Sequence, residues 1–435
     1  MKTGKILLCV VVFGLFIGCK QQPSYSTFRG DNQHTGVYES VDIEQPALKW
    51  KCNLNGVAIS SPAVIDDIAY IGSGDNHLYA IDIENGQVKW KFATQGAIHS
   101  SPAVNNEMVY FGSNDGNFYA VDKNKGTEKW IFKTQGEKQY SAINLFGFDT
   151  DSVEAADPWD FYLSSPIVEG EMVYFGSGDS YIYALNANTG ELVWEYKTGN
   201  VVHSSPAISN GTVFCGSFDS KLYALDAKTG DKKWVFEAGT DEKYHLMCGI
   251  QASPMIKDGI VYSGCRDAYI YAVEAATGKL KWKQKFGSSW MPGSAAISGD
   301  RLYVGSSDAK KYYSLDAKTG AIIDSLPTNS YTFSSPAISG STVYIGVFNG
   351  FLHAFDKNNG KMKWTFETDA GNSDFVNEDG TIKKELFEDI TYKQHSDMAL
   401  YLERIFSLGS IASSPVVYNN VIYFSSADGF LYAIN

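Results

Sequence analysis

Seven aspartates recur at equivalent places along this chain, and they are the first residues that could do chemistry together. Side by side they would form a ring of acids. Each of them, however, lies in a short turn between two strand-like runs, where an aspartate side chain accepts hydrogen bonds from its own backbone. We therefore interpret them as turn residues: Asp75, Asp115, Asp179, Asp219, Asp267, Asp308 and Asp428.

A second acidic feature, residues 149–157, has the density of carboxylates that a calcium loop would need. An EF-hand-type loop requires a glycine where Glu154 stands and an oxygen ligand where Val153 stands. Both requirements fail. The sequence predicts a solvated loop here and no metal site.

His99 and His203 each stand three residues before the proline of a Ser-Pro pair, and so occupy equivalent positions in two repeats. A structural zinc site needs four ligands close together, and two separated histidines do not supply them. We expect both to be packing residues at the mouth of a central pore. Trp290 is expected near the same mouth, as a structural cap or as a platform for a planar ligand.

The cysteines show neither a CxxC spacing nor a Cys/His cluster, so they do not predict zinc. Cys248 and Cys265 flank two strand-like runs whose antiparallel pairing would bring them to one end of a sheet. A Cys248–Cys265 disulfide is one interpretation. The other is that both are small buried apolar side chains.

A unit of about 40 residues with four short strand-like runs repeats along the chain, and this period is typical of a β-propeller blade. Its first run carries a Ser-Pro mark, and one unit has Ala295 in place of the proline. The last strand-like run of the chain is the third run of a unit, with no fourth run after it. Residues 47–51, near the N-terminus, supply one additional run of the fourth kind. Eight blades closed by that N-terminal strand account for every run. The marks are Pro62, Pro102, Pro166, Pro206, Pro254, Pro336 and Pro415.

The repeat resembles the family of PQQ-like (quinoprotein-type) propellers, in which Ala-x-Asp-x-x-x-Gly-x-x-x-Trp docks each blade onto the next. Ala80, Asp82, Gly86 and Trp90 match this motif, whereas the sixth unit has Asp324 where tryptophan is expected. The resemblance implies that seven tryptophans dock blades: Trp50, Trp90, Trp130, Trp194, Trp234, Trp282 and Trp364.

The resemblance also bears on activity. Quinone-dependent dehydrogenases of this fold carry two adjacent cysteines over the quinone and a carboxylate and amide set that holds calcium. This chain has no adjacent cysteine pair. We therefore expect no cofactor, no metal and no enzymatic activity, and note a similarity to the lipid-anchored propellers of outer-membrane protein assembly.

The first residues predict a secretory signal, because Lys2 and Lys5 precede an apolar run of about a dozen residues. Cys19 follows a small residue, so this segment resembles a bacterial lipoprotein signal with Cys19 lipidated. We expect a signal peptide at residues 1–18, a lipidated linker at 19–46 and the propeller at 47–435. The absence of aspartate at position 20 favours the outer membrane, and the absence of an acidic run after it favours the periplasmic face.

The formal net charge is −13, which argues against nucleic acid as a partner because phosphate backbones need a basic surface. An aromatic fraction of 14% agrees with a closely packed all-β body. The expected contacts are a membrane, through the N-terminal lipid, and one or more envelope proteins.

Two long insertions, residues 135–163 and 367–411, break the repeat at the same type of connection, so both should rise from one face of the ring. The second carries an apolar stripe with helical spacing from Met398 to Phe406, with Ser396 as a candidate N-cap. A shorter helical stripe precedes it. The candidate partner-binding residues are Trp159, Phe161, Tyr401 and Phe406. Alternatively, the insertions pack onto their own propeller.

Three functions from different classes are compatible with these features. The first is a non-enzymatic, lipid-anchored scaffold that binds another envelope protein, in outer-membrane protein assembly. The second is a ligand- or glycan-binding envelope lipoprotein that uses the aromatic insertions. The third, a PQQ-dependent dehydrogenase, is disfavoured because the adjacent cysteines are missing.

Overall fold

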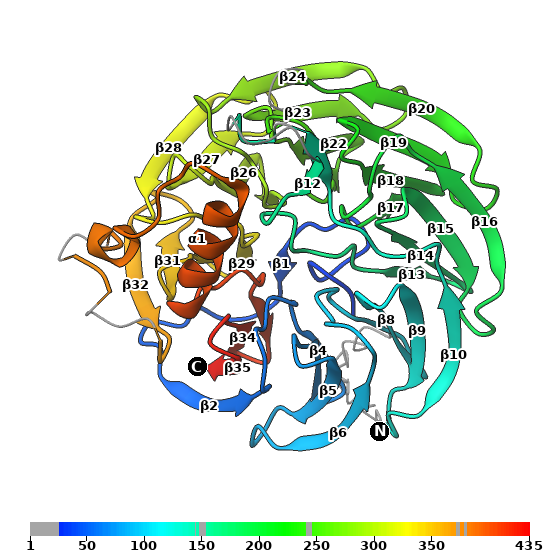
Figure 1. Cartoon of the computed structure of the whole chain (residues 1–435), viewed down its shortest axis with the longest axis horizontal. Helices are drawn as coiled ribbons and strands as arrows, with labels where there is room; N and C mark the ends of the chain where they lie inside the picture. Colours follow the sequence, from blue (N-terminus) through cyan, green and yellow to red (C-terminus); the bar gives the residue numbers. More distant parts are fainter. Residues whose placement is uncertain (1–25, 144, 148–153, 241–245, 371–374, 378–380) are drawn as a thin grey trace, which may run out of the picture.

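The computed structural model describes residues 26–143, 145–147, 154–240, 246–370, 375–377 and 381–435. Over these residues the chain forms eight four-stranded antiparallel sheets, arranged as blades around a central axis (Figure 1). The predicted eight-bladed β-propeller is confirmed. The signal peptide and the candidate lipid-bearing Cys19 lie outside the described residues.

The four strands of a blade differ in burial because blades stack on one another. In blade one, β4 (Ile68–Gly72) and β5 (His77–Asp82) are buried along nearly their whole length. The outermost strand β6 (Val88–Ala93) alternates exposed and half-buried positions. The core therefore lies between successive sheets, which explains why the inner strands are near-continuous apolar runs.

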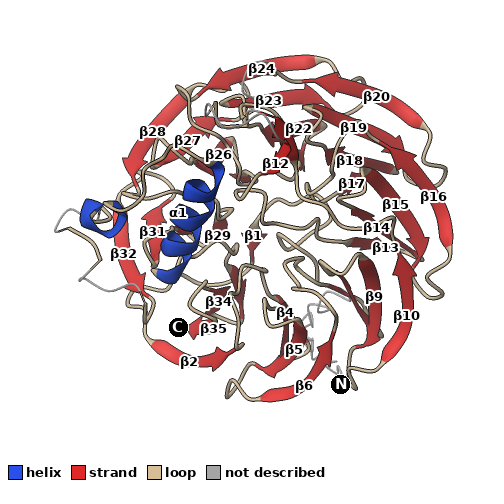
Figure 2. Ribbon diagram, in the orientation of Figure 1, coloured by secondary structure: helices blue, strands red, loops and turns tan. Residues whose placement is uncertain are grey.

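The first four blades each run from the axis outward, and Figure 2 shows them with β-strands in red. Their strands are β3 (Ala63–Ile65), β4, β5 and β6; β7 (Ala103–Val104), β8 (Met108–Gly112), β9 (Asn117–Asp122) and β10 (Glu128–Lys133); β13 (Ile167–Glu169), β14 (Met172–Gly176), β15 (Tyr181–Asn186) and β16 (Leu192–Lys197); β17 (Ala207–Ser209), β18 (Thr212–Gly216), β19 (Lys221–Asp226) and β20 (Lys232–Glu237).

The last four blades repeat the same order, except that the final outer strand comes from the N-terminal part of the chain. Their strands are β21 (Met255–Lys257), β22 (Ile260–Gly264), β23 (Tyr269–Glu274) and β24 (Leu280–Lys285); β25 (Ala296–Ser298), β26 (Arg301–Gly305), β27 (Lys311–Asp316) and β28 (Ile322–Pro327); β29 (Ala337–Ser339), β30 (Thr342–Gly346), β31 (Phe351–Asp356) and β32 (Met362–Glu367); β33 (Val416–Tyr418), β34 (Val421–Ser425), β35 (Phe430–Ile434) and β2 (Leu48–Asn53).

The ring closes as predicted, through β2 and β35. Trp50 pairs with Ala433 in this antiparallel ladder. Beyond the ladder, the backbones of Ala47 and Asn435 exchange two hydrogen bonds, at 2.8 and 3.0 Å. Closure removes the open sheet edge that an unpaired last blade would expose.

All seven tryptophans of the outer strands touch the next blade in the same way. Each indole Nε1 donates to a backbone carbonyl at 2.6 to 3.1 Å. In six cases the acceptor is the residue that follows the third strand of that blade. For Trp364 the acceptor is instead the carbonyl of Ile43, in the segment that precedes β2, the outer strand of blade eight.

Blade six, which has Asp324 in place of a tryptophan, reaches the next blade with a different side chain. Arg301 Nη1 lies 3.5 Å from Asp324 Oδ2 and donates to the carbonyl of Asn358 at 2.9 Å. The tyrosine hydroxyl of Tyr303 donates to the carbonyl of Lys357 at 3.0 Å. An arginine held by a carboxylate thus takes the place of the indole donor.

The described part of the expected linker, residues 26–46, is not free but closes one mouth of the channel. Its backbone pairs with the innermost strands in turn: Ser26 with Val104, and Asn32, Gln33, Thr35 and Gly36 with isoleucines of blades four to seven. β1 (Val37–Tyr38) then lies parallel to β29. We call residues 26–43 the leader.

Arg29, which is buried, ties the leader to blades six and seven. It donates to the carbonyls of Ala295, at 2.8 Å, and Pro336. Gly36 has φ +68°, and a Cβ there would lie 2.2 Å from Arg29 Nη2. Glycine is therefore required for this close approach.

Candidate interaction site

The two insertions meet over the other mouth of the channel, as their shared connection type predicted. The first contains the hairpin β11 (Ser141–Ile143) and β12 (Glu154–Ala156). The second contains the 3-10 helix η1 (Lys384–Phe387) and the helix α1 (His395–Ser407), which lies across this face in Figure 1. We call the described parts of both insertions the cap.

The cap is held by an aromatic cluster that includes the four predicted partner-binding residues. Trp159 stacks on Phe333 of blade seven, with ring centroids 5.7 Å apart. Phe161 meets Phe406 edge-to-face at 5.2 Å, which joins the first insertion to the second. The alternative of self-packing therefore describes most of this apolar area.

These positions correct the expectation that all four residues are exposed anchors. Trp159 and Phe161 are only 5% and 8% exposed, so they form the interior of the cap. Tyr401 and Phe406 are half-buried. Tyr401 and Phe406 therefore offer more surface to a partner than the other two, and Trp159 is accessible only where it lines a groove beside the cap.

Helix α1 begins two residues earlier than an N-cap at Ser396 would place it. Its N-cap is Gln394, whose side chain makes no capping hydrogen bond to the helix backbone, and Ser396 lies inside the helix. Asp397 reaches back instead: its carboxylate accepts from the backbone N–H of Lys393 at 3.0 Å and from Thr391 Oγ1 at 2.6 Å. A carboxylate in the first turn also suits the helix dipole.

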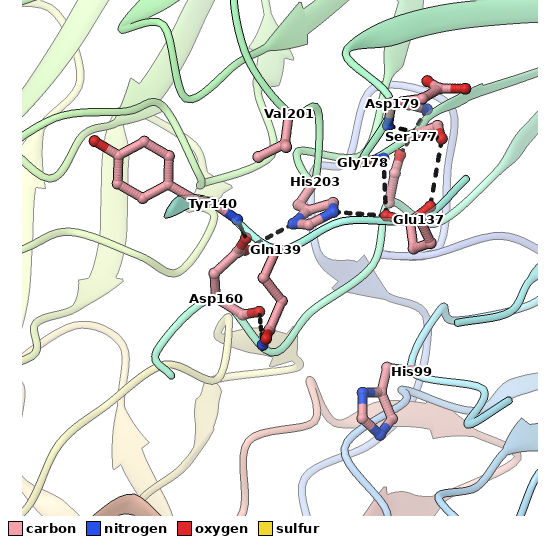
Figure 3. Close-up of polar contacts among 12 residues, drawn as sticks. His99, Glu137, Gln139, Tyr140, Asp160, Ser177, Gly178, Asp179, Val201 and His203 are labelled. Atoms are coloured by element: carbon pink, nitrogen blue, oxygen red, sulfur yellow. Dashed lines mark hydrogen bonds and ion pairs between the residues drawn. The ribbon is translucent and has the colours of Figure 1, made fainter. Parts of the chain in front are cut away.

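A buried charge cluster ties the first insertion to blade four (Figure 3). His203 Nδ1 donates to Asp160 Oδ1 at 2.7 Å, and Nε2 donates to Glu137 Oε1 at 2.8 Å. Burial alone would lower the pKa of His203, but Asp160 and Glu137 outweigh it and raise that pKa to about 10. His203 is thus an imidazolium ion that bridges two carboxylates.

Both carboxylates are also held by backbone donors. Asp160 Oδ2 accepts from the N–H of Tyr140 at 2.6 Å, and Glu137 Oε1 accepts from the N–H of Gly178 at 2.8 Å. A Cβ at Gly178 would lie 2.3 Å from that same Glu137 oxygen. Every charge in the cluster has a partner, so the cluster stabilises the packing of the cap on blade four.

A second buried ion pair, between Arg266 and Asp157, ties the same insertion to blade five. Both side chains have no exposed surface. Arg266 also donates to Gln251 Oε1 at 3.0 Å and lies 4.3 Å from the ring centroid of Trp290. The predicted role of Trp290 as a structural cap agrees with this position.

The sequence contains a signal for this pair in the comparison of the eight blades. Seven of the eight blades have Gly, Asn, Ser, Ala or Phe immediately before the aspartate or asparagine of this turn, and only blade five has an arginine there, Arg266. Glu137, Asp157 and Asp160 carry no such signal, because insertions have no repeat to compare with.

Between its two closed mouths the channel holds a belt of serines. In seven of the eight links, the backbone N–H of one serine donates to the hydroxyl of its counterpart in the next blade, at 2.8 to 3.2 Å. The cavity left on the axis is about 40 Å³. His99 borders it and donates to the carbonyl of Phe161 at 3.0 Å.

The predicted Cys248–Cys265 disulfide is not formed. Both residues are buried cysteines with intact thiols, and the Cys265 thiol donates to the carbonyl of Gly249 at 3.4 Å. Burial raises the pKa of Cys265 well above its usual value, so the thiol stays protonated. The alternative of small apolar side chains fits this environment.

Six of the seven repeated aspartates are the turn residues that we expected. In each, one carboxylate oxygen accepts from the backbone N–H two residues on, and the other accepts from a tyrosine hydroxyl at 2.5 to 2.7 Å. Asp308 differs. Among the described residues its carboxylate accepts from Ser307 Oγ, at 2.6 Å, and from no tyrosine.

Asp308 borders a groove of about 570 Å³ between blade six and the cap. Trp290 and Tyr331 belong to the propeller side of this groove, and Met398 and Tyr401 of α1 belong to the cap side. Apolar side chains exposed on the cap itself are Ile143 (57%), Tyr392 (45%) and Leu400 (39%). The cap face therefore offers both a hollow and protruding apolar residues.

Within the described ranges, no group of three or more His, Cys, Asp or Glu side chains is arranged to hold a metal ion. Over those ranges, also, no helix has the length and apolarity to cross a membrane.

The closed ring, the indole bonds between blades and the serine belt define the class of protein: an eight-bladed propeller of the PQQ-like type. A sequence model of the family described as "Outer membrane protein assembly factor BamB" matches residues 35–150, 152–286 and 266–435. The matches cover most of the chain, so the chain belongs to this family.

Individual similarities are more distant. The BamB of Moranella endobia (strain PCIT) is 24% identical over 162 residues, which are 33% of this chain and 42% of that protein. The crystal structure of BamB from Moraxella catarrhalis superposes with a TM-score of 0.66 at 16% identity, over 90% of this chain and 100% of that one. A europium-containing methanol dehydrogenase superposes with a TM-score of 0.71 at 13% identity, over 95% and 98%. Such low identities show a shared fold alone.

Proposed function

We propose that this protein is a non-enzymatic, lipid-anchored scaffold of the cell envelope that binds another protein through its cap face, in outer-membrane protein assembly. The observation that carries the proposal is the difference between the two faces. The leader face is filled by the chain's own backbone, whereas the cap face presents a groove and exposed apolar side chains. Apolar and aromatic side chains of this kind dominate protein interfaces.

A quinone-dependent dehydrogenase is a poor fit to the propeller axis. Ligand pockets for molecules of that size measure about 300–1,000 Å³, and the axial cavity is about 40 Å³. Its walls are serines already bonded to one another. The sequence has no adjacent cysteines, and among the described residues no group of three or more His, Cys, Asp or Glu side chains lies there, so the residues present do not fit the cofactor.

The proposed lipid anchor supports the choice of face. Only seven residue steps separate Cys19 from Ser26, which is paired with the innermost strand of blade two, so this tether spans at most about 25 Å. To reach the cap side, the tether would have to cross about 14 Å from the innermost to the outermost strand of a blade, which is three strand spacings. It would then have to run about 20 Å along a six-residue strand and turn back towards the axis. The tether is too short for that path. An anchored propeller therefore turns its cap face away from the leaflet that holds the lipid.

The test is to reverse the character of the exposed cap surface without touching its core. Ile143→Glu with Leu400→Glu should abolish chemical crosslinks to envelope partners in solubilised membranes, since both side chains are exposed on the cap and neither lines the groove. The matched control is Leu192→Glu with Val193→Glu on the outer strand β16, where both side chains are similarly exposed. Equal crosslinking by both variants, with unchanged melting temperatures, would contradict the proposal.

A further inference from the structure

Asp308 borders the groove beside the cap at the point where blade six breaks the repeat. β26 pairs Gly305 with Tyr312, seven positions on, whereas β4 pairs Gly72 with Leu78, six positions on. The turn of blade six is thus one residue longer. The extra residue moves Asp308 out of the turn position that its six counterparts occupy, and its carboxylate borders the groove instead.

The walls of the groove are aromatic and adaptable. Trp159, Trp290 and Tyr401 supply flat apolar surfaces, and Met247 and Met398 supply flexible ones. Methionine side chains adjust to different occupants, which is why they are common on peptide-binding surfaces. At about 570 Å³ the groove has the volume of a specific binding pocket.

One polar group in this groove lacks a strong partner. The indole N–H of Trp290 donates to the sulfur of Met247 at 3.2 Å, and a thioether is a weak acceptor. Trp290 is 6% exposed, so water does not compensate fully. An occupant with a carbonyl oxygen would give this donor a better acceptor, and Asp308 would accept from a donor of the same occupant.

We infer that the groove seats an extended peptide segment of a partner protein, with a large apolar side chain between the aromatic walls and a neighbouring lysine or arginine at Asp308. This inference rests on the proposed function and names the partner's chemistry. A peptide has the required carbonyl oxygens and N–H groups, together with an apolar side chain, in one short segment.

The charges around the groove favour a basic segment. Asp308 is exposed, and the chain as a whole carries a formal charge of −13, which attracts cationic segments. Of the described cations near the groove, Arg266 is neutralised by Asp157, and the ammonium of Lys310 lies 5.2 Å from the ring centroid of Tyr331. Lys310 is exposed, so an incoming cation can replace it over that ring.

Selection from a phage-displayed library of random short peptides against the purified protein tests this inference. We expect enriched sequences to combine Lys or Arg with an adjacent large apolar residue. Their affinity should fall by about tenfold or more in Asp308→Lys and in Met398→Glu. The matched control is Asp300→Lys, the same charge change at an exposed turn on the opposite face of the same blade, which should leave binding unchanged.

Three outcomes would overturn the inference: no enrichment, enriched peptides that bind Asp308→Lys as well as the unchanged protein, or binding of neutral oligosaccharides on a glycan array that Met398→Glu abolishes. Envelope crosslinking of Asp308→Lys separates this result from the proposed function. If Asp308→Lys keeps every partner while Ile143→Glu with Leu400→Glu loses them, the groove is not the peptide site but the cap face still binds. If neither variant loses a partner, the proposed function fails.

Discussion

The two mouths of the central channel are closed by different kinds of contact. The leader closes one mouth mainly with backbone hydrogen bonds to the inner strands of successive blades. The cap closes the other with packed aromatic rings and two buried charge clusters. Backbone pairing makes few demands on side chains, whereas a buried charge is costly unless its partner is in place. The cap mouth is therefore the more sensitive to substitution and to pH.

The two mouths also differ in the protonation state of a buried histidine. At the leader mouth, burial lowers the pKa of His34 to about 4, and the neutral ring donates to the carbonyl of Pro254. At the cap mouth, Asp160 and Glu137 hold His203 charged. Relative to an unfolded histidine near pH 6.5, the stabilisation from His34 is lost as the pH falls from about 6.5 to 4. That from His203 is present below about pH 6.5 and is lost as the pH rises towards 10.

The largest effect is expected from breaking the Arg266–Asp157 pair at the cap mouth. Arg266→Met leaves the Asp157 carboxylate buried without its partner, at a cost of about 3–5 kcal/mol of unfolding free energy. Urea denaturation would measure it. The control is the double variant Arg266→Met with Asp157→Asn, which should recover part of the loss; a single variant as stable as the unchanged protein would contradict the role of this pair.

A smaller loss is expected at the leader mouth. Arg29→Met removes two charge-assisted hydrogen bonds to carbonyls but leaves the backbone pairing of the leader intact. The expected cost is about 2–3 kcal/mol, since each such bond contributes about 1.5–3 kcal/mol and part is recovered by packing the methionine. Hydrogen exchange should show the leader amides still protected. Complete loss of that protection would mean that side chains, not the backbone, close this mouth.

The pH dependence of the cap should be a progressive loss of unfolding free energy from pH 7 to pH 10, at a rate of at most about 1.4 kcal/mol for each pH unit. Exchange of amides in residues 137–143 and 154–160 should accelerate over that range, because deprotonated His203 no longer bridges two carboxylates. In His203→Gln the alkaline change should disappear. Acceleration that persists in His203→Gln would assign it to another group.

The smallest effect is expected midway between the mouths. Ser101→Ala removes one hydroxyl from the serine belt and leaves the N–H of Ser61 without its acceptor. A loss of about 1 kcal/mol follows from a single neutral hydrogen bond. Thermal unfolding would measure it, with Ser141→Ala in the cap hairpin as a control outside the belt. A loss as large as that of Arg266→Met would mean that the belt, rather than the mouths, dominates.

The repeat predicted the propeller, the number of blades, the closure by residues 47–51 and the common face of the two insertions. These all depend on local periodicity and on pairing rules that hold for any blade. The same periodicity led to the wrong prediction that Asp308 is a turn residue like its six counterparts. One added residue in the turn moves its carboxylate without changing the sequence pattern around it. The periodicity also suggested a disulfide between Cys248 and Cys265, since position along paired strands does not define whether two sulfur atoms meet.

From the sequence alone, the residue types and their period determine that the chain is a closed eight-bladed ring with two insertions on one face. Only the tertiary structure decides that Trp159 and Phe161 lie inside the cap, that His203 is shared by Glu137 and Asp160, and that the leader fills the opposite mouth. The physical reason is that strand pairing repeats and is read along the chain. The contacts of the cap and the leader join residues that lie between 43 and 307 positions apart in the examples given, and each of these contacts occurs once.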